Sequence, residues 1–134
     1  MMQRRKFIRL SALGGAAIGI AGINCHHARP EFFGILEKPA QLSYICDAKT
    51  LREIGQAYRL QIPAESEADK LVELMTVDSA GKSVSSSSDK LFLQNLVDQK
   101  IARDFEKGNT VVVKGWILAV TEARQCALFF VNYQ

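Results

Sequence analysis

The second half of the last predicted helix is apolar on every side, and this limits how the chain can fold. The segment 120–132 has the features of a helix, with Thr121 as a candidate cap and Glu122 in the first turn, where a negative charge suits the helix dipole. Residues 126–131 are apolar all round, and a helix of that kind is buried on every side. We therefore expect this helix either to be the centre of its domain or to be covered in part by another protein.

A second helix is predicted at 47–60, with Asp47 or Thr50 as its cap. One face carries apolar residues at helical spacing, namely Leu51, Ile54 and Tyr58. Gly55 lies inside this helix, where glycine costs about 1 kcal/mol relative to alanine. We therefore expect a close packing contact at Gly55.

The predicted fold class is all-α. Two more helices are expected at 66–77 and 88–107, and the longer one is amphipathic. The segment 110–118 is rich in β-branched and aromatic residues, but no other segment offers a good partner strand. We expect it to lie across the helices as one short extended segment. The prediction for 47–134 is a single domain, a small bundle of about four helices.

Residues 26–46 are predicted to be an extended linker, because Pro30 and Pro39 interrupt regular structure. Four of its residues are more apolar than a free tether needs: Phe32, Phe33, Ile35 and Leu36. We expect these side chains to pack either on this domain or on a partner.

Residues 1–25 have the pattern of a twin-arginine export signal. Arg4 and Arg5 are followed by Phe7 and then by an apolar run over 10–23. That run has 14 residues, whereas a membrane-spanning helix needs about 20, so a signal is favoured over a permanent anchor. Such a signal is read by the twin-arginine translocase and is not part of the fold. It predicts export of the folded protein to the bacterial periplasm, with attachment to the inner membrane.

Cys25 ends the apolar run, at the place where a lipoprotein carries its lipidated cysteine. Asn24 and Gly22 depart from the residues usual there, and cleavage after Ala28 is an alternative that also fits poorly. Lipidation at Cys25 and cleavage without lipidation both stay open. Membrane contact would then come from the lipid or from a partner.

The charge of the mature chain gives no support for nucleic-acid binding. Four of the 17 basic residues precede Cys25, which leaves 13 against 14 acidic residues. A basic patch is therefore not expected.

The cysteines and histidines predict no metal or haem site. The three cysteines form neither a CxxC nor a CxxCH motif. His26 and His27 are the only histidines, and a two-ligand site near the mature N-terminus would be loose. We predict no catalytic, cofactor-binding or metal-binding residue, and hence no enzyme activity in this chain. Cys46 and Cys126 either form a disulfide in the oxidising periplasm or are buried free thiols.

The sequence Gly-Trp-Ile-Leu-Ala-Val-Thr-Glu-Ala-Arg-Gln-Cys-Ala-Leu at 115–128 resembles a block in one family of small proteins. The segments around it follow in the same order: the twin-arginine signal, Ile-Gly-Gln-Ala-Tyr at 54–58 followed by Pro63, then Asp-Phe at 104–105 and Gly108. The family is the small third subunits of periplasmic flavin-dependent dehydrogenases, of the gluconate 2-dehydrogenase subunit 3 and sorbitol dehydrogenase small-subunit type.

The resemblance implies a non-catalytic accessory subunit. In such complexes the large subunit holds FAD and oxidises a polyol or sugar acid, and a cytochrome subunit passes electrons to the membrane. The small subunit holds no cofactor, binds the large subunit and supports its export. The alternative is a stand-alone periplasmic lipoprotein with a ligand-binding or structural role.

Six residues are predicted to contact the partner: Trp116, Glu122, Arg124, Phe129, Phe130 and Tyr133. Aromatic side chains and arginine dominate interface energetics. Trp116 has the alternative of filling its own core. Glu122 and Arg124 are two positions apart and do not face each other on a helix, so they either pair with separate groups or are solvated.

Overall fold

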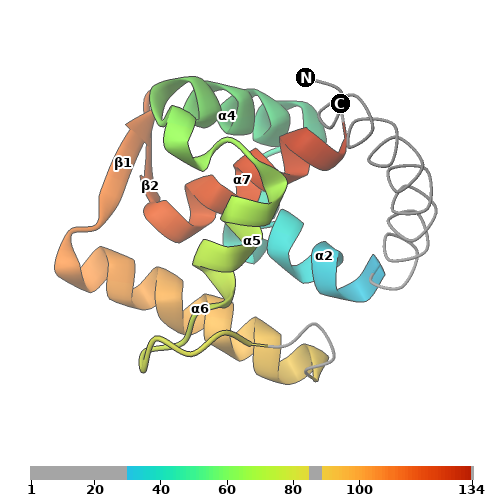
Figure 1. Ribbon diagram of the computed structural model, residues 1–134. Helices are drawn as coiled ribbons and strands as arrows, with labels where there is room; N and C mark the ends of the chain where they lie inside the picture. The colour runs from blue at the N-terminus through green and yellow to red at the C-terminus, as the bar shows by residue number, and fades with distance from the viewer. Residues whose placement is uncertain (1–29, 85–88, 134) are drawn as a thin grey trace, which may run out of the picture. The chain divides into compact units, whose positions relative to one another are not determined.

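Helices make up most of the structure, which is a computed structural model describing residues 30–84 and 89–133 (Figure 1). The residues from Glu31 onward belong to one compact unit. Its elements, in chain order, are α2 (Pro30–Glu37), α3 (Ala40–Ser43), α4 (Ala48–Gln61), the 3-10 helix η1 (Pro63–Glu65), α5 (Ala68–Thr76), α6 (Lys90–Lys107), β1 (Thr110–Val113), β2 (Trp116–Ala119) and α7 (Val120–Asn132). The predicted export residues Arg4, Arg5, Phe7 and Cys25 lie outside the described residues.

Helix α7 is the centre of the domain, which confirms the first of the two alternatives for it. Figure 1 shows α7 in the middle, with α4 above it and α6 below. From Thr121 to Phe129 every side chain except that of Arg124 is buried. The neighbours of α7 are α4, α5, α6 and both strands. A helix that is apolar all round is stable in a domain of this size because other elements of the same chain surround it.

The packing of α4 on α7 depends on Gly55, as the sequence predicted. A Cβ atom placed on Gly55 would overlap the carbonyl oxygen of Cys126 and lie 2.9 Å from the backbone nitrogen of Ala127. The two helix backbones therefore touch at this point, which no other residue type allows. This contact explains a glycine in the interior of a 14-residue helix.

The prediction of an all-α fold is wrong, because the segment before α7 is an antiparallel hairpin. Strand β1 pairs with β2 in a register that sets Val112 opposite Ile117 and Val113 opposite Trp116. The two residues between the strands, Lys114 and Gly115, have φ angles of 51° and 84°. Two consecutive residues with positive φ form the tight turn that joins twisted strands. The partner strand that the sequence seemed to lack thus lies within the same segment, beyond this turn.

The segment predicted to be an extended linker instead contains α2 and α3. Ile35, Leu36 and Leu42 are buried in the core. The side-chain amide of Gln125 in α7 donates to the carbonyl oxygens of Ile35 (3.1 Å) and Lys38 (3.3 Å). Ile35 and Leu36 therefore pack on their own domain, while the side chains of Phe32 and Phe33 lie outside the described residues. The proline-containing break falls between the two short helices.

Polar side chains set the ends of α4 and α7. Asp47 caps α4 by accepting a hydrogen bond from the Thr50 N–H at 2.8 Å, as one of the two predictions had it. Helix α7 has the predicted bounds, but Thr121 is not its cap, since the N-cap residue is Ala119. The backbone N–H of Thr121 donates instead to Asp104 of α6 at 2.8 Å. A carboxylate from another helix thus satisfies a free N–H in the first turn of α7.

Candidate functional site

A charged cluster joins α4, η1 and α7. The Arg124 Nε donates to the Glu65 Oε1 at 2.6 Å, and the Tyr58 hydroxyl donates to the same oxygen at 2.9 Å. Both charged side chains are 19% exposed. Pro63 ends α4 and opens η1, and this turn of the chain brings Glu65 back beside Tyr58. The cluster therefore depends on the corner between α4 and η1.

The protonation states in this cluster follow from burial and hydrogen bonding. Burial and the hydrogen bond to Glu65 raise the pKa of Tyr58 to about 12. Burial alone would raise the pKa of Glu65, but the hydrogen bonds from Arg124 and Tyr58 lower it overall. At neutral pH the cluster holds a neutral phenol, a carboxylate and a guanidinium. It can donate hydrogen bonds and carry charge, and all three groups are already engaged with one another.

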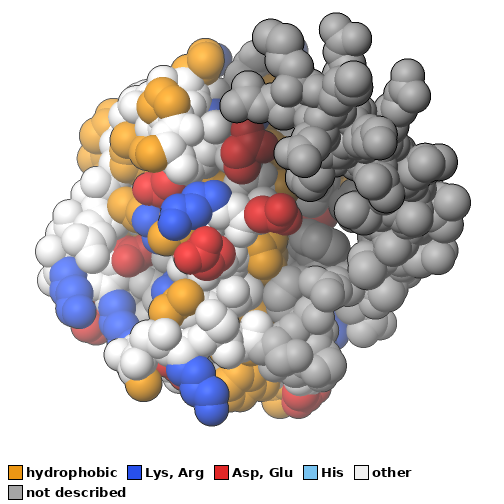
Figure 2. Space-filling view, viewed as in Figure 1, with side chains coloured by type: hydrophobic (Ala, Val, Ile, Leu, Met, Phe, Trp, Pro, Cys, Tyr) orange, Lys and Arg blue, Asp and Glu red, His pale blue; other side chains and the backbone are white. Residues whose placement is uncertain are grey.

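A pocket of about 490 Å³ opens beside this cluster. Its lining comes from α4, η1, α6, the start of the hairpin and α7, and consists of Tyr58, Ile62, Glu65, Asp104, Gly108, Asn109, Thr110, Val111, Val120 and Arg124. Figure 2 shows acidic and basic side chains interspersed with apolar ones on one face of the molecule. The pocket has the size of a small-ligand site and mixed polar and apolar walls.

Two carboxylates meet at the first turn of α7. The Asp104 Oδ2 accepts two hydrogen bonds from Thr121, one from its backbone N–H at 2.8 Å and one from its side-chain hydroxyl at 2.6 Å. The Glu122 carboxylate is buried and accepts a hydrogen bond from the Ala119 N–H at 3.1 Å. Burial raises the pKa of Glu122, and the nearby charge of Asp104 raises it further. Both carboxylates stabilise the start of α7, where the helix dipole favours negative charge.

Sequence reasoning did not identify Tyr58, Glu65 or Asp104 as site residues. Tyr58 was assigned to an apolar helix face and to the segment 54–58 of the family resemblance, without a role in a site. Nothing in the sequence links Glu65 to Arg124 across 59 positions. Asp104 follows the pattern of a polar residue on an amphipathic helix, so its contact with Thr121 becomes visible only in three dimensions.

The six predicted partner-contact residues divide by burial. Glu122 and Phe129 are buried in the core of this chain and leave little surface for a partner. Trp116 is half-buried and packs against the core, in line with its alternative role. Phe130 is half-buried and Tyr133 is 50% exposed. Glu122 and Arg124 pair with separate groups, which confirms one of the two alternatives for them.

Cys46 and Cys126 are free thiols in the structure. Cys126 is fully buried in α7, and burial raises the pKa of its thiol. Cys46 is half-buried, follows α3 and packs against the core. A disulfide between them stays a prediction.

Over 30–84 and 89–133 no group of three or more His, Cys, Asp or Glu side chains is placed to hold a metal ion. Over the same residues no helix has both the length and the hydropathy to cross a bilayer. Comparison of the chain with protein-family models, with curated proteins and with solved structures found no match.

Proposed function

We propose that this chain is a non-catalytic accessory subunit of an exported, membrane-associated flavin-dependent dehydrogenase. It binds the catalytic subunit, which carries the FAD, and supports export of that subunit through the twin-arginine translocase into the periplasm. A cytochrome subunit would complete the complex at the inner membrane. The proposal starts from the signal at 1–25 and from the resemblance of 115–128 to small subunits of such enzymes.

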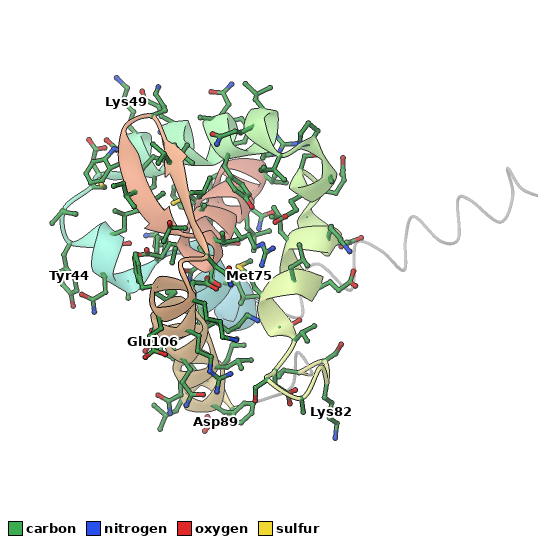
Figure 3. All side chains as sticks on the ribbon, turned by 90° about the vertical axis from the view of Figure 1, so that its left-hand side faces the viewer. Tyr44, Lys49, Met75, Lys82, Asp89 and Glu106 are labelled. Carbon is green, nitrogen blue, oxygen red and sulfur yellow. The ribbon has the colours of Figure 1, made fainter. Side chains whose placement is uncertain are left out.

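The observation that supports an interaction role is the apolar outer face of the hairpin. Val112 and Ile117 lie directly opposite each other and are 59% and 69% exposed. The strands alternate, so that Val113 and Leu118 are buried on the inner face. Figure 3 looks onto the hairpin. An adjacent pair of exposed β-branched side chains is the kind of surface that a partner protein covers.

The pocket beside Tyr58 and Arg124 supports the second candidate, a stand-alone lipoprotein that binds a small ligand. Its volume of about 490 Å³ is within the range of small-molecule sites. A stand-alone protein would be a stable monomer and would purify without a flavoprotein.

The test is copurification from gently solubilised membranes of the organism that encodes the chain. A tagged wild type is expected to bring down a flavoprotein in stoichiometric amount, seen by flavin absorbance and mass spectrometry. The double variant Val112→Asp/Ile117→Asp is expected to copurify at most about one tenth of the flavin that the wild type brings down. A tenfold loss of affinity corresponds to about 1.4 kcal/mol.

The matched control is Leu91→Asp/Phe92→Asp, which alters two exposed apolar residues at the start of α6. Helix α6 has 18 residues and is about 27 Å long, and its far end precedes the hairpin. The control is expected to retain the flavoprotein. A wild type that purifies as a monomer without flavin would contradict the proposed function.

A further inference from the structure

A groove of about 430 Å³ lies along the end of α4, apart from the pocket beside Tyr58. Its lining comes from α4, η1 and α7 and consists of Gln56, Arg59, Leu60, Pro63, Ser66 and Phe130. We call it the Arg59 groove. It contains one basic residue and no acidic residue.

Arg59, which lines this groove, is held in place by two contacts. Its Nε donates to the Ser66 carbonyl oxygen at 2.8 Å, and its guanidinium carbon lies 5.3 Å from the centre of the Phe130 ring. Arg59 is in the last turn of α4, where the helix dipole favours a positive charge. One edge of the guanidinium is therefore fixed by the chain itself, and stacking on an aromatic ring restricts its remaining freedom.

The charge of Arg59 has no acidic partner among the described residues. The salt bridges there involve Lys49, Lys70 and Arg124. Arg124 is neutralised by Glu65, whereas Arg59 forms its hydrogen bond with a neutral carbonyl. The terminal nitrogens of an arginine held in this way match the two oxygens of a carboxylate.

Besides Arg59 and the polar residues Gln56 and Ser66, the lining of the Arg59 groove includes three apolar residues. Leu60 is 77% exposed, Pro63 is exposed, and Phe130 is half-buried. The groove therefore pairs one unneutralised cation with aliphatic and aromatic surface. Its chemical complement is a carboxylate flanked by an apolar side chain.

The end of α4, which contributes to the groove, is tied to the hairpin by a hydrogen bond. Gln61 follows Leu60 directly, and its side-chain amide donates to the Val112 carbonyl oxygen at 3.1 Å. That carbonyl belongs to the residue opposite Ile117. The end of α4 therefore contacts the strand whose outer face carries Val112.

We propose that the Arg59 groove binds a segment of a partner protein in which an Asp or Glu stands next to an apolar residue. The carboxylate forms a bidentate ion pair with Arg59, and the apolar neighbour packs between Leu60 and Phe130. This inference rests on the proposed function, since it assumes a protein partner, and it specifies the chemistry of the contact.

The direct test uses a fluorescein-labelled peptide, Leu-Phe-Glu-Leu, and its Leu-Phe-Gln-Leu counterpart, with fluorescence anisotropy on the full chain in mild detergent. The wild type is expected to bind the Glu peptide at least about tenfold more tightly than the Gln peptide. Arg59→Gln is expected to abolish this preference. Arg52→Gln, which changes another arginine on the same helix, is expected to keep it.

The proposal is overturned if the wild type binds both peptides equally or binds neither at millimolar concentration. It is also overturned if Arg59→Gln keeps the preference. Thermal unfolding of Arg59→Gln shows whether that variant is folded. Phe130→Leu is a second variant, which removes the ring and keeps the charge of Arg59. It is expected to weaken binding of the Glu peptide by at least about threefold.

Copurification separates this inference from the proposed function. If Arg59→Gln copurifies at most about one tenth of the flavoprotein that the wild type does, the result supports both the groove proposal and the accessory role. Retention of the flavoprotein by Arg59→Gln would overturn the groove proposal and leave the accessory role standing. A wild type without any flavoprotein would contradict the accessory role, and the peptide preference would then decide the groove by itself.

Discussion

Arg124 and Glu65 form an ion pair at 2.6 Å between the central helix and the short 3-10 helix, across 59 positions of sequence. Each side chain is 19% exposed, so the pair is largely shielded from water. It connects α7 to the corner at which α4 ends, and that corner also forms one wall of the Arg59 groove.

Removal of one partner is expected to destabilise the fold. Glu65→Ala leaves the Arg124 guanidinium and the Tyr58 hydroxyl without their acceptor, and we expect a loss of about 2 kcal/mol in the free energy of unfolding. Urea unfolding measures this. Glu73→Ala is the control, because its pairing with Lys70 is exposed, and we expect a change below about 0.5 kcal/mol. Equal losses in the two variants would contradict a special role for the Glu65 pair.

The same pair makes stability depend on acid pH. The pKa of Glu65 is lowered in the folded state, so its contribution is fully present above the pKa of an unfolded Glu and disappears as pH falls through the folded value. We expect the stability difference between wild type and Glu65→Gln to be constant near neutral pH and to shrink below about pH 4. A stability difference that grows on acidification would mean that folding raises the pKa of Glu65 and would contradict this prediction.

Tyr58 is expected to titrate well above the ordinary pKa of a tyrosine. Its pKa is raised to about 12, so it favours folding below the ordinary tyrosine pKa near 10, and this contribution disappears as pH rises through 12. Absorbance of the phenolate during an alkaline titration should show a late step, and Tyr58→Phe should remove that step. If the late step remains in Tyr58→Phe, another tyrosine is responsible for it.

Gly55→Ala tests the contact between α4 and α7. The added methyl group would overlap the backbone of α7 at Cys126, and we expect a loss of about 2–3 kcal/mol even though alanine favours a helix. Gly34→Ala is the matched control, since nothing lies within 4 Å of a Cβ at Gly34 in α2, and it is expected to be neutral or slightly stabilising. Thermal unfolding measures the stability of both variants, and equal stabilities would contradict the close contact at Gly55.

The hairpin turn offers a stabilising change. Lys114 has a φ of 51°, a conformation that asparagine adopts more readily than lysine. We expect Lys114→Asn to raise the free energy of unfolding by about 0.5–1 kcal/mol. Lys107→Asn, at the exposed end of α6, should give no such gain. If Lys114→Asn lowers the free energy of unfolding, the result would contradict a positive φ at position 114.

Arg4→Lys with Arg5→Lys tests the export role. Both this chain and a partner without its own signal are expected to stay in the cytoplasm, which fractionation and immunoblotting would show. A partner that still reaches the periplasm would have its own route, and carrying it would not be the function of this chain.

Local patterns were sufficient to predict most of the helices. The bounds of α7, the cap at Asp47 and the close contact at Gly55 follow from residue types and spacing, because these features depend on neighbours within one or two turns. The hairpin was missed because its turn, Lys114-Gly115, lacks the usual asparagine or aspartate signal. The helices at 30–43 were missed because prolines and short length hide their periodicity.

The sequence alone predicted that the helix at 120–132 lies in the interior, since its second half is apolar all round and exposing that surface is unfavourable whatever the fold. In the structure residues 126–129 are buried, and Phe130 and Val131 are half-buried. Only the tertiary structure decided what surrounds them. It also decided that Glu65 meets Arg124, that Asp104 holds the start of α7, and that Arg59 is left beside apolar walls without an acidic partner. These are contacts between residues far apart in the chain, and their energies depend on distance and burial, which residue order does not carry.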